Sequence, residues 1–385
     1  MSHRTPSAAH RPPFTLAIVG ASTRAAAFSA FRAGWQPWCA DSFADVDLRA
    51  ICPVTPVPWQ AYARELPSLL ARAPEAPWIY TGALENRPGL VGKLAALRPL
   101  WGNGPAVLRR ARQPWHVAAV LRQEGLACPG IWPRERSGPD HGRWLVKPLA
   151  SAGGLGIIPW QPGAAPRSRT YLQELIDGDA CAAVYVGHGE GQAFLLGVTR
   201  QLIGLPWLFA APFQYCGSVG PLPLSASTTT KFARLGDVCA TRLGLRGLFG
   251  VDCILRDEVP YPVEINPRYT ASVEVLEHAL GIQALTLHRQ ACRKEPLHAR
   301  VARPTSIVGK AILFARAPLT VPARGPWSAA LEQPCLGLRS FADIPEGGEV
   351  IERGQPVLTA FASASSMTTC LEALQNAAGA VDRLL

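Results

Sequence analysis

The chain has 385 residues, 48% of them hydrophobic, and this length predicts two or three domains rather than one small core. Its formal net charge is +10, but the basic residues are scattered, with no run of five and no stripe interleaved with aromatic residues. This distribution argues against nucleic-acid and membrane-surface partners and favours small anionic ligands such as nucleotides and carboxylates. No uninterrupted apolar stretch is long enough to span a membrane, and residues 1–13 lack the apolar segment of a signal peptide. We therefore expect a disordered tail at residues 1–13 and a cytoplasmic protein.

The ten cysteines form no CxxC pair and no cluster with histidine. Most stand in apolar surroundings, as Cys253 does in the segment VDCIL. We interpret them as small core residues in a reducing compartment, and we expect no structural zinc site.

The first domain is expected over residues 14–104 and opens with a strand, a helix and a second strand. Residues 14–20 are typical of a buried strand, an amphipathic helix follows to Gly34, and the next strand ends at Asp41. The intervening turn, GASTR, lacks the GxGxxG pattern and gives only weak support to a dinucleotide site. Residues 78–86 predict a later strand whose carboxyl end carries Glu85 and Asn86.

Polar residues at these strand ends are candidate substrate contacts, because ligands of open α/β sheets bind beyond the carboxyl ends of the strands. For each of them, a capping or turn role is the alternative interpretation. The six candidates are Ser22, Thr23, Arg24, Asp41, Glu85 and Asn86.

A lysine and a glycine-rich loop follow in residues 143–160, RWLVKPLASAGGLGIIPW. The pattern predicts a strand that ends at Lys147, a loop of small residues and a second strand. Glycines let backbone N–H groups approach phosphate oxygens closely, and a lysine adds a point charge to the same phosphates. Because no GKS or GKT follows and no helix pattern opens, this is not a Walker loop. The loop candidates are Ser151, Gly153, Gly154 and Gly156.

Residues 171–179, YLQELIDGD, predict a strand that runs into a turn. The acidic groups in this segment are suited to hold a ribose or an adenine amino group.

Acidic side chains mark two paired strands in residues 248–268, LFGVDCILRDEVPYPVEINPR, which we expect to be joined by the turn-rich segment RDEVPYP. Because side chains alternate along a strand, Glu264 and Asn266 share one face, and Asp252 has the same alternation on the partner strand. Two carboxylates and a carboxamide supply the oxygen ligands that Mg²⁺ prefers. The alternative is a half-buried hairpin whose carboxylates face water.

The C-terminal part is expected to be a small β-rich lobe closed by a helix over about 365–385. PEGG and RGQP are turn signals between short strands. Leu371, Leu374, Ala378, Val381 and Leu385 recur at three- and four-residue steps, which predicts an apolar face that packs on the lobe or forms a dimer surface.

In this order, the glycine loop, the segment QELIDG and the acidic hairpin resemble the ATP-grasp superfamily of ATP-dependent ligases. The resemblance implies an α/β (α+β) protein with the ATP-grasp fold: an N-terminal Rossmann-like pre-ATP-grasp domain at 14–104, an ATP-grasp domain at 105–320 and a C-terminal β-rich lobe at 321–385. The whole arrangement is similar to a group of biotin-carboxylase-related carboligases. Some members of that group are linked to one-carbon metabolism that uses tetrahydromethanopterin and methylofuran.

The resemblance also implies a role for each motif, with ATP and Mg²⁺ as cofactors, two magnesium ions, and Mn²⁺ as a possible substitute. Lys147 and the glycine loop would bind phosphate, and Arg268 would be the catalytic cation together with Lys147. Asp179 would contact the ribose. The adenine hinge would comprise Gln173, Glu174 and Ile176, and the metal ligands would be Asp252, Glu264 and Asn266.

One upstream position departs from the family pattern. Many relatives have a first phosphate-binding lysine at the start of the helix that follows residue 105, whereas this chain has Arg109, Arg110 and Arg112. Arg112 is a candidate replacement, because a guanidinium binds phosphate bidentately. The alternative is an exposed basic cluster at the start of a helix.

These expectations combine into an ATP- and Mg²⁺-dependent carboxylate–amine ligase that acts through an acylphosphate, with small-molecule partners such as an amino acid, of which glutamate is one. A role in methylofuran or tetrahydromethanopterin biosynthesis is implied only by the resemblance. The alternatives are a bicarbonate-using carboxylase and a nucleotide-binding regulator without turnover. A homodimer is compatible with the terminal helix.

Overall fold

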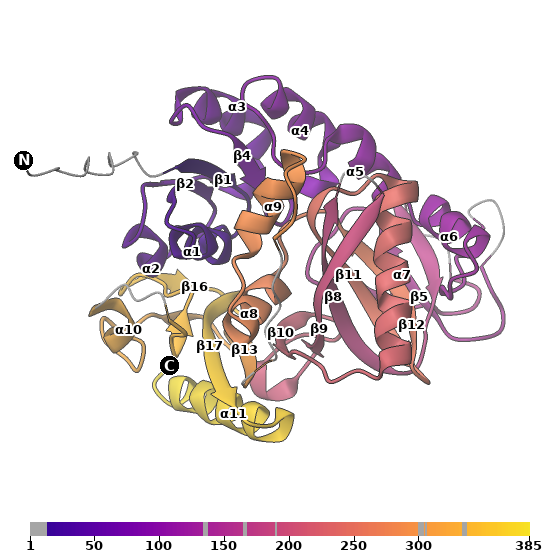
Figure 1. Cartoon of the computed structure of the whole chain (residues 1–385). Helices are drawn as coiled ribbons and strands as arrows, with labels where there is room; N and C mark the ends of the chain where they lie inside the picture. Colours follow the sequence, from indigo (N-terminus) through magenta and orange to yellow (C-terminus); the bar gives the residue numbers. More distant parts are fainter. Residues whose placement is uncertain are drawn as a thin grey trace, which may run out of the picture.

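The computed structural model describes residues 14–133, 138–164, 168–188, 191–298, 304, 306–332 and 337–385. The middle of the chain forms most of a large sheet, with an N-terminal α/β domain beside it and a C-terminal lobe that adds strands to it (Figure 1).

A four-stranded parallel sheet, in the order β3-β2-β1-β4, forms the N-terminal domain. Its strands are β1 (Thr15–Val19), β2 (Gln36–Asp41), β3 (Val54–Pro56) and β4 (Trp78–Tyr80). Its helices are α1 (Arg24–Arg32), α2 (Val46–Arg49), α3 (Tyr62–Arg72) and α4 (Pro88–Ala95), with 3₁₀ turns η1 (Trp59–Ala61) and η2 (Leu84–Asn86). The predicted strand, helix and strand at the start of the domain are confirmed.

The single strand expected over residues 78–86 is wrong in its second half. β4 ends at Tyr80, the chain turns through Gly82 and through Ala83 with φ +83°, and Glu85 and Asn86 lie on η2. The positive φ of Ala83 ends the extended conformation, because L residues adopt a positive φ mainly at turns. Both side chains are thereby carried beyond the edge of the sheet.

The large sheet has eight strands in the order β12-β11-β8-β9-β10-β13-β17-β15, and all its pairings are antiparallel. The strands are β8 (Asp179–His188), β9 (Gln192–Ile203), β10 (Tyr215–Gly220), β11 (Gly247–Arg256), β12 (Val259–Asn266), β13 (Ile307–Phe314), β15 (Phe341–Ala342) and β17 (Pro356–Ala364). The helices around it are α7 (Ala226–Leu243), α8 (Ala271–Leu280), α9 (Ala284–Cys292) and α11 (Met367–Asp382), with the short turn η3 (Pro206–Leu208).

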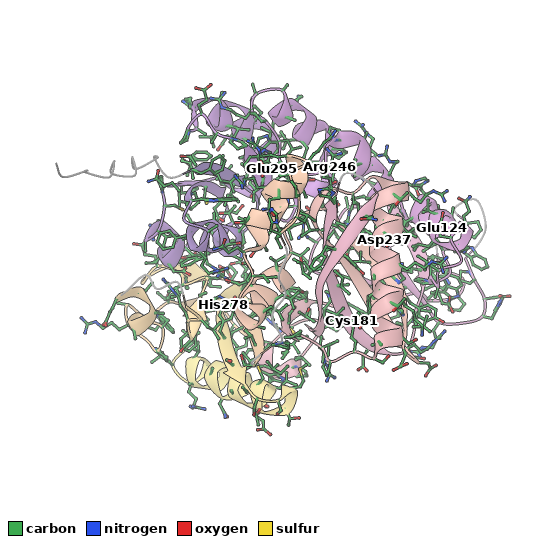
Figure 2. All side chains as sticks on the ribbon, in the orientation of Figure 1. Glu124, Cys181, Asp237, Arg246, His278 and Glu295 are labelled. Carbon is green, nitrogen blue, oxygen red and sulfur yellow. The ribbon has the colours of Figure 1, made fainter. Side chains whose placement is uncertain are left out.

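Alternation along β8 divides the interior into two cores. Val184 and Val186 pack in a cluster with α8, α9 and the N-terminal domain, whereas Ala183 and Tyr185 pack beneath α7. Cys181 belongs to the same cluster as Tyr185. Figure 2 labels Cys181 near α7. Successive side chains of a strand point to opposite faces, so one strand stabilises both layers.

A smaller sheet, β6-β5-β7, lies beside β12 and completes the middle of the chain. Its strands are β5 (Trp144–Pro148), β6 (Ile158–Pro159) and β7 (Thr170–Glu174), and the helices before it are α5 (Pro105–Ala111) and α6 (Pro114–Gln123). The helix expected over this region is therefore two helices. Gln113 caps α6 by accepting from the backbone N–H of His116 at 2.6 Å, and Pro114 starts that helix.

The turn of the acidic hairpin is shorter than predicted. Only Asp257 and Glu258 form it, with φ of +50° and +60°, and the segment VPYP belongs to β12. β12 is an edge strand of the sheet, where prolines are tolerated because no partner needs their missing N–H.

Three C-terminal strands, β13, β15 and β17, extend the large sheet, because β13 pairs with both β10 and β17 and β15 pairs with β17. Two short strands at 319–320 and 350–351 pair with each other in a separate two-stranded sheet. The remaining elements of this lobe are β14 (Leu319–Thr320), α10 (Ser328–Glu332) and β16 (Val350–Ile351). Leu374, Ala378 and Val381 of α11 are buried against β13 and β17, as the packing interpretation of this helix predicts. The domain boundary at residue 320 stays a prediction.

Nine cysteines are free in the described part of the chain, and all are buried or half-buried; Cys335 lies outside it. Across the described residues, every helix is too short or too polar to cross a membrane.

Lowering the pH should destabilise the fold through His288. This α9 side chain is 4% exposed, its Nδ1 accepts from the backbone N–H of Leu248 at 2.7 Å, and its Nε2 lies 3.2 Å from the carbonyl oxygen of Trp101. Burial lowers the pKa of His288 to about 4, although the Trp101 carbonyl acts in the opposite direction. Between about pH 6.5 and 4, His288 is therefore protonated in the unfolded chain but neutral in the folded chain. The free energy of unfolding should fall by roughly 3 kcal/mol over that interval.

Urea denaturation of the wild type and of His288→Gln at pH 7.5, 6 and 4.5 checks this. The variant should lose less stability than the wild type as the pH falls, whereas His116→Gln, at an exposed position on α6, should behave as the wild type. Equal acid sensitivity of His288→Gln and the wild type would refute the role of His288.

Candidate functional site

A cleft lies between the small sheet, the acidic hairpin and the glycine loop, and it encloses about 260 Å³ of water-accessible space. Its lining brings together segments that are far apart in the sequence: the loop at 152–154, the hinge at 173–176, the hairpin at 252–266 and Arg268. The three motifs on which the sequence analysis depends therefore meet at one place.

The predicted metal ligands converge on adjacent strands of this cleft. Asp252 on β11 is paired in register with Glu264 on β12, and the amide of Asn266 donates to Oδ2 of Asp252 at 3.0 Å. Burial, followed by the nearby charge of Glu264, raises the pKa of Asp252 to about 7. Two carboxylates that repel each other in a buried place are stabilised by a cation between them. The donor set thus fits a hard divalent ion.

Glu264 differs from Asp252 because two basic side chains approach it. Burial alone would raise the pKa of Glu264, but the charges of Arg112 and Lys147 outweigh burial and hold that pKa below its usual value. Within the described residues, no cluster of three or more His, Cys, Asp or Glu side chains could hold a metal ion, so the predicted site depends on two carboxylates and the amide of Asn266.

Lys147 lies at the centre of the site, on β5. It is 7% exposed, and its Nζ donates to Oε1 of Gln173 at 3.0 Å and to the carbonyl oxygen of Val263 at 3.1 Å. Burial lowers the pKa of Lys147, while the charges of Glu264 and Asp252 oppose that shift. The ammonium thus stands between the hinge and the metal ligands, where the phosphates of a nucleotide would lie.

Replacing Lys147 by methionine should weaken ATP binding at least tenfold more than AMP binding, because a lone ammonium contributes on the order of 1.5–3 kcal/mol to a charged hydrogen bond. Calorimetric titration of both nucleotides measures the difference. Lys93→Met, at an exposed position on α4, is the matched control and should bind both as the wild type does. Equal losses of affinity for ATP and AMP would show that Lys147 does not contact the phosphates beyond the first.

The glycine loop is held over the cleft by its backbone. Gly153 accepts from the backbone N–H of Tyr215 at 3.0 Å, and a Cβ at Gly154 would come within 1.9 Å of the carbonyl oxygen of Phe213. Gly154 also has φ +79°, a conformation that L side chains rarely adopt. Any other residue at this position would push the loop away from Phe213.

The predicted hinge residues Gln173, Glu174 and Ile176 line the cleft, but Asp179 does not, and the adenine contact stays a prediction. Asp179 begins β8, is exposed, and lies 3.9 Å from Arg200. A ribose contact by Asp179 therefore receives no support from its position.

Arg268 forms the wall of the cleft beside the metal ligands. Its Nε donates to Oε1 of Glu85 at 2.7 Å, and its Nη2 donates to Oδ1 of Asn266 at 3.2 Å. Glu85 is 1% exposed, and its Oε2 has no hydrogen-bond partner among the described residues. The N-terminal domain thus supplies a buried carboxylate that orients the predicted catalytic arginine.

Arg112, at the end of α5, also points into the site. Its Nη1 donates to Oε1 of Glu264 at 2.6 Å, and its Nε and Nη2 donate to Oδ1 of Asn86 at 3.2 and 2.9 Å. Arg112 lies beside Lys147 and Glu264 and is not part of an exposed cluster. Its N–H groups are used by protein acceptors and it does not line the 260 Å³ cleft, so a phosphate contact by Arg112 stays a prediction.

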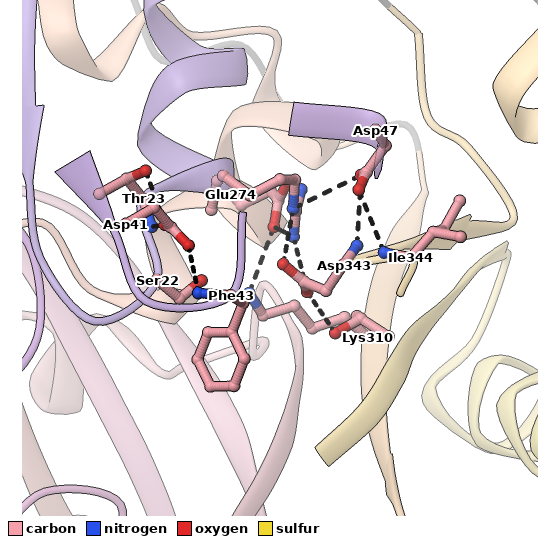
Figure 3. Close-up of polar contacts among 12 residues, drawn as sticks. Ser22, Thr23, Asp41, Phe43, Asp47, Glu274, Lys310, Asp343 and Ile344 are labelled. Atoms are coloured by element: carbon pink, nitrogen blue, oxygen red, sulfur yellow. Dashed lines mark hydrogen bonds and ion pairs between the residues drawn. The ribbon is translucent and has the colours of Figure 1, made fainter. Parts of the chain in front are cut away.

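Three of the other four substrate candidates, Thr23, Arg24 and Asp41, make contacts that hold the fold together. Oδ2 of Asp41 accepts from the hydroxyl of Thr23 at 2.8 Å, and its Oδ1 accepts from two backbone N–H groups at 2.8 Å, so this carboxylate holds a turn (Figure 3). Arg24 is buried in ion pairs with Glu274 and Asp343, which join α1 to α8 and to the C-terminal lobe. Ser22 is exposed. The cleft lining includes none of these four.

Sequence reasoning missed the polar end of the cleft at the start of α8. Thr270, the residue before α8, is 8% exposed, and its Oγ1 has no partner among the described residues. Ser272 and Gln201 line the same end. A threonine just before an apolar helix is typical of an ordinary N-cap residue. Only the absence of a hydrogen bond from its hydroxyl, which the sequence does not reveal, separates Thr270 from such a cap.

Comparison with known proteins agrees with the fold. Residues 111–272 match the family model described as the ATP-grasp domain. The biotin carboxylase domain of Hydrogenobacter thermophilus 2-oxoglutarate carboxylase, solved with MgADP and bicarbonate, aligns with a TM-score of 0.71 at 13% identity, over 94% of this chain and 89% of that chain. An L-amino acid ligase of Bacillus licheniformis aligns with a TM-score of 0.69 at 16% identity, over 96% and 98%. Residues 111–272 thus match the ATP-grasp domain model, and the chain has the ATP-grasp fold, as the order of its motifs predicts.

Two curated relatives are similar at the sequence level. An uncharacterized protein of Methanocaldococcus jannaschii is 26% identical over 192 residues, which are 49% of this chain and 41% of that protein. A formate-dependent phosphoribosylglycinamide formyltransferase of Azoarcus sp. (strain BH72) is 26% identical over 213 residues, 51% of each chain. The chain spans about half the length of the curated relatives it matches.

Proposed function

We propose that the protein is an ATP- and Mg²⁺-dependent carboxylate–amine ligase that forms ADP. The observation that carries the proposal is the convergence of Asp252, Glu264, Lys147 and Arg268 on one cleft. Two carboxylates for a divalent ion, a buried ammonium and a guanidinium are the set that a phosphoryl transfer needs, because that reaction depends on positioning and on charge neutralisation.

The reaction divides into two steps. A carboxylate oxygen of the acid substrate attacks the γ-phosphorus of ATP, the bond from phosphorus to the ADP oxygen breaks, and an acylphosphate forms. The nitrogen of the amine then attacks the acyl carbon, loses a proton and releases inorganic phosphate. Lys147 and Arg268 neutralise the transferring group, and the glycine loop keeps water from the acylphosphate. A bound Mg²⁺ would lie on Asp252, Glu264 and Asn266 and supply further charge neutralisation.

We propose that the acid substrate binds at the start of α8. The unpartnered hydroxyl of Thr270, the N-terminal end of the helix and Arg268 offer donors and positive charge to a carboxylate at the end of the cleft away from the hinge. The acid itself is proposed to be small. A role in methylofuran or tetrahydromethanopterin biosynthesis rests on the resemblance of the chain to carboligases of one-carbon metabolism.

Acid-quenched assays of ADP release test the proposal, with formate, bicarbonate and single amino acids as acids, each with and without an amine panel. A ligase releases ADP in step with consumption of an acid and an amine. Release that depends on bicarbonate would instead support a carboxylase, which the bicarbonate bound in the Hydrogenobacter thermophilus structure makes the second candidate. ATP binding without any release would support a regulator and contradict the proposal.

A further inference from the structure

The side chain of Arg112 connects three separate parts of the molecule. It contacts Glu264 and the carbonyl oxygen of Ile265 on β12, Asn86 on η2, and the carbonyl oxygen of Ser151 in the glycine loop, the last at 3.4 Å. The Arg112 side chain is 13% exposed, so these contacts form largely away from water, where charged hydrogen bonds are strong.

Asn86 uses both ends of its amide at this junction. Its Oδ1 accepts from two nitrogens of Arg112, while its Nδ2 donates to the carbonyl oxygen of Ser151 at 3.0 Å. The Ser151 carbonyl therefore has donors from both Asn86 and Arg112. A carboxamide supplies an acceptor and a donor at once, which neither a carboxylate nor an apolar side chain does.

The glycine loop is thereby attached at two points. The hydrogen bond from Tyr215 to Gly153 ties it to the large sheet, and the contacts at Ser151 tie it to the N-terminal domain through Asn86. The guanidinium of Arg112 also contacts Glu264, so one side chain connects the glycine loop to a predicted metal ligand.

We propose that Asn86 is a positioning residue, which directs Arg112 onto Glu264 and, together with Arg112, holds the glycine loop closed through the carbonyl of Ser151. Its importance for turnover rests on the proposed function, but its effect on the loop does not. Asn86 is thus assigned to the geometry of the nucleotide site and not to substrate contact. Arg112 and a divalent ion would compete for the Glu264 carboxylate. Because Arg112 also holds the loop, loop closure and cation binding are coupled.

Hydrogen exchange of the nucleotide-free protein, followed by mass spectrometry, tests the loop contact. Amides of residues 149–157 should exchange about tenfold faster in Asn86→Ala than in the wild type, the change expected from losing one hydrogen bond of ordinary net strength. Exchange in α7 and β8 should be unchanged, which separates a local effect from general destabilisation. Ser22→Ala, an exposed change in the same domain, is the control and should match the wild type.

Asn86→Asp separates the two ends of the amide. The carboxylate still accepts from Arg112 but no longer donates to Ser151, so the loop should exchange as fast as in Asn86→Ala.

Mn²⁺ titration without nucleotide tests the coupling between the loop and cation binding. Arg112→Gln removes the positive charge beside Glu264, so this variant should bind Mn²⁺ several-fold more tightly than the wild type.

Unchanged exchange at residues 149–157 in folded Asn86→Ala, or wild-type Mn²⁺ affinity in Arg112→Gln, would overturn the assignment. If the loop responds as expected but no acid stimulates ADP release, the positioning role stands and the proposed ligase activity fails.

Discussion

Glu264→Gln should lower the turnover number by at least about a hundredfold while the protein remains folded. Arg112 and Lys147 hold the pKa of this carboxyl below its usual value, and together with Asp252, paired opposite it in register, the carboxylate would hold a divalent ion. Glutamine has nearly the same shape but lacks the charge. A loss of about two orders of magnitude corresponds to roughly 2.7 kcal/mol of transition-state stabilisation, within the range that metal ligation supplies.

Steady-state kinetics at saturating MgATP measure this loss, with thermal unfolding to verify the fold. Glu258→Gln changes the same residue type at the exposed turn of the same hairpin and should leave turnover as in the wild type. If Glu264→Gln retains a tenth of the wild-type rate or more, the metal assignment is wrong.

The second large effect is expected at Arg268. Arg268→Ala should reduce turnover by about 10²–10³-fold but change the affinity for ATP much less, because a cation aimed at the transferring group acts mainly in the transition state. The guanidinium is already oriented in the free protein by Glu85 and Asn266, so little reorganisation is needed when the substrate binds.

Removing Arg268 alone also leaves Glu85 buried without its partner, at a cost to folding on the order of 3–5 kcal/mol. The double variant Arg268→Ala with Glu85→Gln avoids that charge and should restore stability without restoring turnover. Calorimetry of ATP binding and single-turnover kinetics should be measured on both variants. Recovery of turnover in the double variant would show that Arg268 is structural.

The acidic hairpin was predictable because its signal is local. A period of two places Glu264 and Asn266 on one face, and the antiparallel partner brings Asp252 opposite Glu264. The same holds for Lys147 and the glycine loop, since several glycines close together between two strands favour a loop whose backbone approaches a ligand. The structure brings these groups together as the order of motifs implies.

The contribution of the N-terminal domain was not predictable in the same way. Glu85 and Asn86 are candidates because they follow a strand. The partner of Glu85, Arg268, lies 183 residues away in the sequence, and the partner of Asn86, Arg112, lies 26 residues away. Thr23 and Asp41 carry similar polar groups at similar strand ends, yet they bond to each other. Which polar residue contacts an arginine of the site depends on tertiary packing, and the turn at Ala83, with φ +83°, carries Glu85 and Asn86 toward Arg268 and Arg112.

The central claim is acyl activation by phosphoryl transfer, and oxygen transfer tests it most directly. The acid that stimulates ADP release is labelled with ¹⁸O in its carboxylate and incubated with MgATP and the amine, and the released phosphate is analysed by mass spectrometry. Attack of the carboxylate on the γ-phosphorus places one labelled oxygen in each phosphate, because that oxygen stays with phosphorus when the amine displaces it. Phosphate without label, or AMP in place of ADP, would contradict the account.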